Sequence, residues 1–373
     1  MRAERIAILL VLALGSACAT QRAGERVDLD PVKVVASPQG PDALEFYDAE
    51  TLFDRGLDLM RGGAWRESLG YFERVLSEFP SSRFELPAMF NRAVCFLHLS
   101  DGAGALAAID AYLAALPPDA DDKHVLDGRF KRGQALALLH RYEEAAALYD
   151  ELIVEELAAS DHVEALVDSG VCHFMAGDRV TAEYRFLAAK RVFREASKLE
   201  RLEVKYFLAQ ANFYLAEIAR AEFSELKLRF PSAAELGGDV TLEAALGDQL
   251  EEKCQRLLRA QYAFIRTIRD GHPGWASAAG YKVGQMYEEL HHDLVTLPEP
   301  ADLTDEQRAM YQRLLREKVL ILLEKAVKVW QATADMATRT GERNEWVART
   351  RQSLERVKSY VLAQASKDAP SKS

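Results

Sequence analysis

The sequence predicts an all-α protein, an α-solenoid built from stacked helical hairpins, with longer helices in its C-terminal part. Apolar or small residues recur at three- and four-residue steps along most of the chain, which is the spacing of one helical face. One two-helix pattern also returns in four copies at nearly constant spacing. Because a single hairpin cannot bury both of its apolar faces, we expect the copies to stack.

The first copy of the pattern spans residues 49–80. A Gly62–Gly63 pair separates its two helices, and Pro80 ends the unit because proline cannot continue a helix. The apolar stripe of the first helix contains Gly56, and that of the second contains Phe72. A glycine in the stripe lets the second helix approach closely, so these two positions predict how the hairpin packs.

The later copies keep this register when they are counted from the small residue of each first helix. The steps between these small residues are 37, 40 and 37 positions. His173 falls on a packing stripe of the fourth copy, and we expect it to be a buried histidine with satisfied hydrogen bonds. The anchoring small residues are Gly56, Ala93, Gly133 and Gly170.

The pattern resembles the tetratricopeptide repeat, whose basic unit is about 34 residues long. The resemblance implies a helical superhelix over residues 43–231, with residues 197–231 as a fifth, degraded copy. One departure recurs: Arg55, Arg92 and Arg132 precede the small residue where the family usually has an apolar one. Either the first helices face differently from those of the family, or these guanidinium groups extend to carboxylates at the surface.

Residues 240–363 are predicted to form a C-terminal helical region that resembles further repeats. Gly284 lies in register for a first helix, and Trp330 lies in register for a second helix. The last residues, 364–373, are predicted to be a disordered tail. The helices expected in this region cover residues 242–269, 276–294, 304–338 and 343–363.

The N-terminus has the features of a lipoprotein signal peptide over residues 1–17. Two arginines precede the apolar stretch Ile6–Leu14, which is too short for a permanent membrane span of about 20 residues. Small residues then precede Cys18, and this arrangement resembles the bacterial lipobox. The resemblance implies cleavage before Cys18 and acylation of its thiol. The alternative is a plain secretory signal.

Residues 18–42 are polar and proline-containing, and we expect them to form a flexible tether. Cys18 is followed by Ala19 and not by an aspartate, and in such lipoproteins this favours the outer membrane. The predicted location is therefore the periplasmic face of the outer membrane, with the folded body held there by a lipid anchor.

The net charge of −11 argues against a nucleic-acid partner, which would need a basic surface, and against a polybasic contact with anionic lipid. Apart from Cys18, the chain has Cys95, Cys172 and Cys254. An odd number of cysteines in an oxidising compartment argues against a complete disulfide framework. Cys95 and Cys172 occupy equivalent positions two repeats apart, and we expect these two to be small buried packing residues.

Stacked first helices line the inner surface of such a superhelix, and mostly apolar residues fall at the positions that should face it. One interpretation is a partner groove for an apolar or amphipathic segment, with aromatic anchors. The alternative is that a lengthened helix or the C-terminal half covers these residues as core, since large bare apolar patches are rare. The predicted groove residues are Phe53, Leu57, Met60, Phe90, Val94, Leu97, Phe130, Val167, Val171 and Phe174.

No motif of a hydrolase, a phosphate-binding loop or a zinc site occurs, so we predict no catalytic residue, metal or cofactor. The densest group of candidate metal-binding side chains is His291-His292-Asp293. Adjacent residues on a helix point about 100° apart, which serves a shared metal poorly. We interpret this group as a solvated helix end.

Residues 44–155 also resemble the outer-membrane β-barrel assembly lipoproteins, which are tetratricopeptide proteins. The resemblance lies in the stretches GGAWRESLGYFERVLSEFPSS, AAIDAYLAALPPDADD and DGRFKRGQALALL. It implies a scaffold that binds envelope or outer-membrane proteins through its repeats. Similar repeat lipoproteins also serve in secretion and gliding-motility machines, which is the first alternative. An envelope enzyme acting on peptidoglycan is the alternative from another class.

Overall fold

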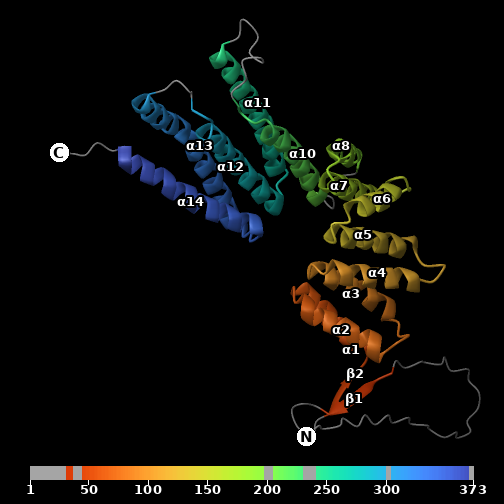
Figure 1. Cartoon of the computed structure of the whole chain (residues 1–373). Coiled ribbons are helices and arrows are strands. Elements are labelled where there is room, and N and C mark those ends of the chain that lie inside the picture. Colours follow the sequence, from red (N-terminus) through yellow and green to blue (C-terminus); the bar gives the residue numbers. More distant parts are fainter. Residues whose placement is uncertain (1–30, 37–43, 197–204, 230–240, 300–303, 369–373) are drawn as a thin grey trace, which may run out of the picture. The chain divides into compact units, whose positions relative to one another are not determined.

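The computed structural model describes residues 31–36, 44–196, 205–229, 241–299 and 304–368 (Figure 1). These residues are helical apart from one short pair of strands, so the predicted all-α fold class is confirmed. The chain divides into two compact units, Met1–Ala145 and Ala146–Ser373. The predicted signal peptide and Cys18 lie outside the described residues.

The first unit begins with an antiparallel pair of strands, β1 (Lys33–Ala36) and β2 (Leu44–Tyr47), in which Lys33 lies opposite Tyr47. The Tyr47 hydroxyl donates a hydrogen bond to Glu78 over 2.8 Å, and the Lys33 ammonium lies 3.6 Å from the same carboxylate. The prediction of a flexible tether over residues 18–42 is therefore wrong for β1. The two valines of β1 favour a strand, and β2 provides its partner.

The helices of the first unit form antiparallel hairpins, with α1 packed on α2 and α3 packed on α4. The turn after α1 contains Gly63 at a φ of 76°, a left-handed conformation that favours glycine. The N-cap of α1 is Asp48, whose carboxylate accepts a hydrogen bond from the Thr51 backbone N–H over 2.8 Å. These helices are α1 (Ala49–Arg61), α2 (Trp65–Glu78), α3 (Glu85–His98), α4 (Gly102–Ala115) and α5 (Asp122–Leu138).

The second unit continues the pattern with longer hairpins, α7 with α8, α10 with α11 and α12 with α13, followed by α14. The boundary between the two units falls within α6. Within this unit the first helices pack in the order α7, α10, α12 and α14. The helices are α6 (Tyr142–Ile153), α7 (Ala159–Met175), α8 (Arg179–Glu195), α10 (Lys205–Glu225), α11 (Leu242–Arg269), α12 (Pro273–Val295), α13 (Asp305–Thr340) and α14 (Glu345–Asp368).

A glycine of the first helix lies beneath an aromatic ring of the second helix in hairpins of both units. A Cβ atom added to Gly56 would lie 2.7 Å from a ring carbon of Phe72. A Cβ atom on Gly170 would lie 2.6 Å from a ring carbon of Phe186. Gly284 packs in the same way against Trp330, which is fully buried. The close approach predicted from the register is therefore confirmed, including its extension into the C-terminal region.

Two predictions for the second unit differ from the structure. Of the fifth copy, predicted over residues 197–231, the described residues 205–229 contain one helix, Lys205–Glu225, which pairs with α11. Helix α14 also continues to Asp368, five residues beyond the predicted end at 363, because no helix-breaking residue precedes Pro370. None of the helices in the described part of the chain is long and apolar enough to cross a membrane.

Candidate partner-binding site

In the first unit, the predicted groove residues lie between helices. Phe53 is buried, and its ring centroid lies 5.6 Å from that of Phe72 and 5.1 Å from that of Phe84. Phe130 is also buried, whereas the half-buried Phe90 ring contacts Tyr112 at 5.3 Å. The remaining four predicted groove residues of this unit are half-buried: Leu57, Met60, Val94 and Leu97.

In the second unit, Val167 is fully buried, and Val171 and Phe174 are half-buried against the same hydrophobic cluster. The Phe174 ring lies 5.3 Å from that of Tyr214 on the neighbouring first helix. Phe53, Phe130 and Val167 thus serve as core. Phe53 is covered by Phe72 of its own hairpin and by Phe84, rather than by a lengthened helix or the C-terminal half. A role in binding a partner stays a prediction for the seven half-buried residues.

A charged cluster joins two first helices of the second unit, α10 and α12. Glu217 on α10 is buried, and its carboxylate lies 3.1 Å from the Arg220 guanidinium and 3.4 Å from the Lys282 ammonium of α12. Burial lowers the pKa of Lys282, although the Glu217 charge opposes that effect. A second link between the same helices is the hydrogen bond that Ser224 donates to Glu289 over 3.0 Å.

Aromatic side chains surround this charged cluster and extend it to α14. The Lys282 ammonium lies 5.6 Å from the centre of the Trp346 ring, and the Arg349 guanidinium lies 4.9 Å from that ring. Trp346 also contacts Tyr281 at 5.7 Å. The sequence did not predict this cluster, because Glu217, Lys282 and Trp346 lie more than 60 positions apart and no local pattern links them.

His173 is part of a hydrogen-bonded network that joins α6, α7 and α8. Its Nε2 lies 3.1 Å from an Asp150 carboxylate oxygen, and Ser169 donates to the other oxygen over 2.6 Å. Arg185 lies 3.0 Å from the same carboxylate. Burial alone would raise the pKa of Asp150, but the hydrogen bonds from Ser169 and His173 and the Arg185 charge lower it overall. The prediction that His173 has hydrogen-bonding partners is confirmed, whereas its side chain is half-buried rather than buried.

The group His291-His292-Asp293 is more buried than predicted. Asp293 forms an ion pair with Lys253, whose side chain is fully buried and donates to the Leu226 carbonyl over 2.7 Å. Burial lowers the pKa of the half-buried His291. The interpretation as a solvated helix end therefore holds for the exposed His292 and is wrong for Asp293, which anchors a charge inside the helical stack.

The cysteines of the described residues are unpaired thiols. Cys95 and Cys172 are buried as predicted, whereas Cys254 is half-buried. Burial raises the pKa of Cys172 to about 12, which keeps it protonated and unreactive at neutral pH.

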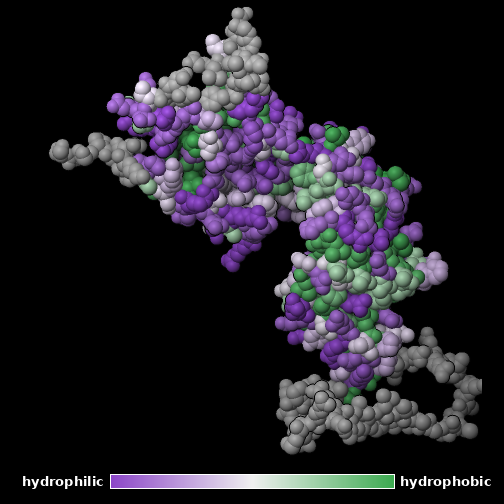
Figure 2. All heavy atoms as spheres, viewed as in Figure 1, coloured by the Kyte–Doolittle hydropathy of each residue, from purple (hydrophilic) through white to green (hydrophobic). Residues whose placement is uncertain are grey.

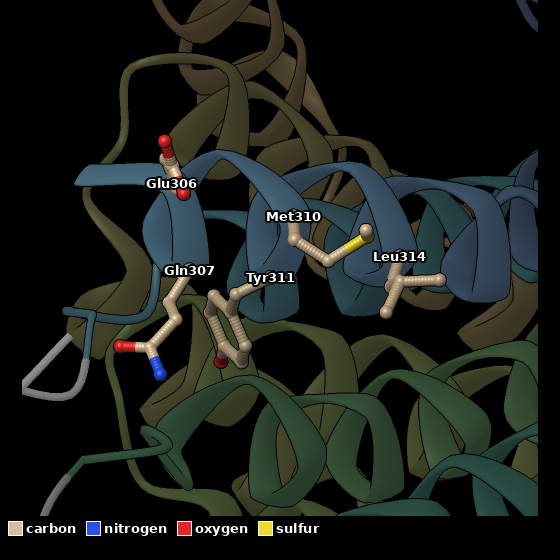
Figure 3. A pocket seen from close by; sticks show the side chains of 5 residues that line it. All are labelled: Glu306, Gln307, Met310, Tyr311 and Leu314. Atoms are coloured by element: carbon tan, nitrogen blue, oxygen red, sulfur yellow. The ribbon is translucent and has the colours of Figure 1, made fainter. Parts of the chain in front are cut away.

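A hollow of about 440 Å³ lies beside the start of α13 (Figure 3). Its lining residues come from two turns of one helix, and none is a buried charged group. No group of three or more potential metal-binding side chains occurs among the described residues. The hollow is lined by Glu306, Gln307, Met310, Tyr311 and Leu314.

Residues 53–120 match the family model described as tetratricopeptide repeat. This match, together with the hairpins α1–α2 and α3–α4, identifies these residues as tetratricopeptide repeats. No curated protein matches the chain.

Solved structures similar to this chain match it at low sequence identity and with TM-scores below 0.5. The apo form of RapI is 10% identical, with a TM-score of 0.45 over 86% of this chain and 99% of that chain. A Rap protein complexed with competence and sporulation factor is 14% identical, with a TM-score of 0.39 over 85% and 76%. A tetratricopeptide repeat protein from Parabacteroides merdae is 15% identical, with a TM-score of 0.38 over 83% and 98%.

Proposed function

We propose that this protein is a non-catalytic periplasmic scaffold, anchored in the outer membrane through Cys18, that binds envelope proteins in outer-membrane protein assembly. The lipobox-like segment before Cys18 supports the anchor, and the stacked helical hairpins support a binding role. Such repeats act by presenting a rigid surface to other proteins, and the partner is expected to bind the first helices.

The observation that carries the binding role is the cluster of Glu217, Lys282 and Trp346 on α10, α12 and α14. The Glu217–Lys282 ion pair and the contact of Lys282 with the Trp346 ring hold these side chains in place in the absence of a partner. Arginine and aromatic residues are enriched among the residues that dominate binding energy. Arg349, which lies over Trp346 and is half exposed, is therefore the side chain that we expect to contact a partner.

The anchor is tested by changing Cys18→Ala or by treating cells with globomycin, which blocks processing of lipoprotein signals. We expect either treatment to prevent acylation and to move the processed protein out of the outer-membrane fraction. Fractionation followed by immunoblotting measures the result. Unchanged processing and membrane attachment in the Cys18→Ala variant would refute the anchor.

Partner binding is tested by crosslinking in cells followed by affinity purification of the tagged full chain. We expect Arg349→Glu to reduce the yield of the main crosslinked envelope protein about tenfold, because it reverses the charge beside Trp346. The matched control is Arg351→Glu, an exposed arginine on the same helix. Equal yields from the two variants and the parent chain would show that this surface is not the binding site.

A further inference from the structure

The second helices α8 and α11 carry the same exposed stripe at the same register. Their buried faces correspond, because Ala182 and Phe186 of α8 and Ala260 and Phe264 of α11 are all fully buried. Each residue of α11 lies 78 positions after its counterpart in α8. At this offset the exposed residues also match: Val180 with Leu258, Tyr184 with Tyr262, and Arg191 with Arg269.

These apolar side chains are unusually exposed. Val180 is 82% exposed, Tyr184 is 61% exposed and Tyr262 is 64% exposed. Leu187 and Leu258 are also about half exposed on the same faces, and Figure 2 shows hydrophobic residues at the surface where α8 lies. Helical spacing of three and four residues places each set on one side of its helix.

Other second helices form the same hairpin without this exposed stripe, so the stripe is not needed for the hairpin to fold. In α13, Ala326 and Trp330 are the buried counterparts of Ala182 and Phe186, and the position of Tyr184 is occupied by Lys328. At the position of Tyr184, α4 has an alanine and α2 has a glycine, so the exposed tyrosine is confined to α8 and α11. Bare apolar patches rimmed by charged residues mark interaction surfaces on soluble proteins.

Contacts with α10 hold the two stripes at the same level. Arg179, next to Val180, lies 2.5 Å from Glu225 of α10. Arg259, next to Leu258, lies 3.0 Å from Glu222, one helical turn away on α10. Further along, burial and the neighbouring Arg266 charge of α11 lower the pKa of Lys190 on α8. The two stripes therefore lie at a similar level along α10, one on each of the second helices that pack against it.

The charge along α11 makes its exposed stripe complementary to itself. The stripe begins with the exposed Glu251, continues through Leu258 and Tyr262, and ends with the exposed Arg269. In an antiparallel pair centred between Leu258 and Tyr262, each tyrosine lies against the leucine of the other copy, and each Arg269 lies against Glu251. The same centre on α8 places Tyr184 against Val180.

We propose that this chain forms a homodimer through the paired α8 and α11 stripes, about a two-fold axis perpendicular to these helices. A second copy fits because one operation covers both apolar stripes and pairs both ends of α11 with opposite charge. Such an isologous contact closes at two copies. This dimer leaves the first helices free to bind the proposed envelope partners. It therefore goes beyond the proposed scaffold function.

Sedimentation equilibrium of the purified full chain tests the dimer, with Cys18→Ala introduced to remove the predicted acylation. We expect a monomer–dimer equilibrium in the micromolar range. Tyr184→Glu with Tyr262→Glu should raise the dissociation constant about 100-fold or more, because each change acts twice in a symmetric interface. The matched control, Lys328→Glu at the equivalent position of α13, should leave the dissociation constant unchanged. Circular dichroism melting checks that each variant is folded.

A charge exchange between exposed residues tests the antiparallel register. Arg269→Glu should weaken the dimer about tenfold, and adding Glu251→Arg in the same chain should restore it. A chain that remains monomeric throughout the micromolar range would overturn the proposal. So would a dimer that survives the tyrosine double variant, or a charge exchange that fails to restore association.

Discussion

At the scale of single residues, the glycines beneath aromatic rings set how closely the two helices of a hairpin approach. We expect Gly170→Ala to destabilise the second unit by about 1–3 kcal/mol, because the added Cβ meets the fully buried Phe186 ring at 2.6 Å. Urea unfolding followed by circular dichroism measures the free energy of unfolding. The matched control is Gly247→Ala in α11, where a Cβ meets nothing within 4 Å.

The control should be neutral or slightly stabilising, because alanine favours a helix over glycine by about 0.5–1 kcal/mol. Equal free energies of unfolding for Gly170→Ala and Gly247→Ala would mean that the aromatic ring moves away without cost. The close approach would then be a consequence of packing elsewhere in the hairpin.

At the scale of helices, the sequence was informative where a local rule determines the structure. The contact between Gly56 and Phe72 recurs between Gly284 and Trp330, and the local pattern around each of these two later residues predicted a first and a second helix far from the first repeats. The sequence did not predict that α10 is a first helix, because apolar and small residues occur all round it. Its buried residues lie on all sides of the helix, so no single apolar stripe shows which side packs against a neighbouring helix. They include Ala211, Asn212, Phe213, Ala216, Glu217, Ile218 and Ala219.

The candidate site was harder to predict from the sequence than the helices, because it depends on contacts between distant segments. The positions of Phe53 and Phe130 on first helices could be predicted, but whether each faces a partner or the core depends on the neighbouring hairpin. The cluster of Glu217, Lys282 and Trp346 depends on contacts between three helices that are distant in the sequence. Strand β1 was missed for the same reason, since four residues become a strand only when a partner strand is present.

At the scale of the whole molecule, each of the two compact units contains hydrophobic clusters of its own. The cluster around Phe72 contains only residues of the first unit, and the cluster around Phe264 contains only residues of the second. In helical-repeat proteins each hairpin contacts only its neighbours, so stability is close to a sum of local terms. Damage to one core should therefore remain within its own unit.

Hydrogen exchange of the full chain provides the measurement, with Phe72→Ala in one unit and Phe264→Ala in the other. Both rings are fully buried, so each change should cost about 3–5 kcal/mol of local stability. We expect Phe72→Ala to accelerate exchange of backbone amides in α1–α4 and to leave α12–α14 unchanged, and Phe264→Ala to do the reverse. The two variants serve as controls for each other. If Phe72→Ala accelerated exchange equally in α12–α14, the chain would unfold as a single cooperative body, and independent units would be excluded.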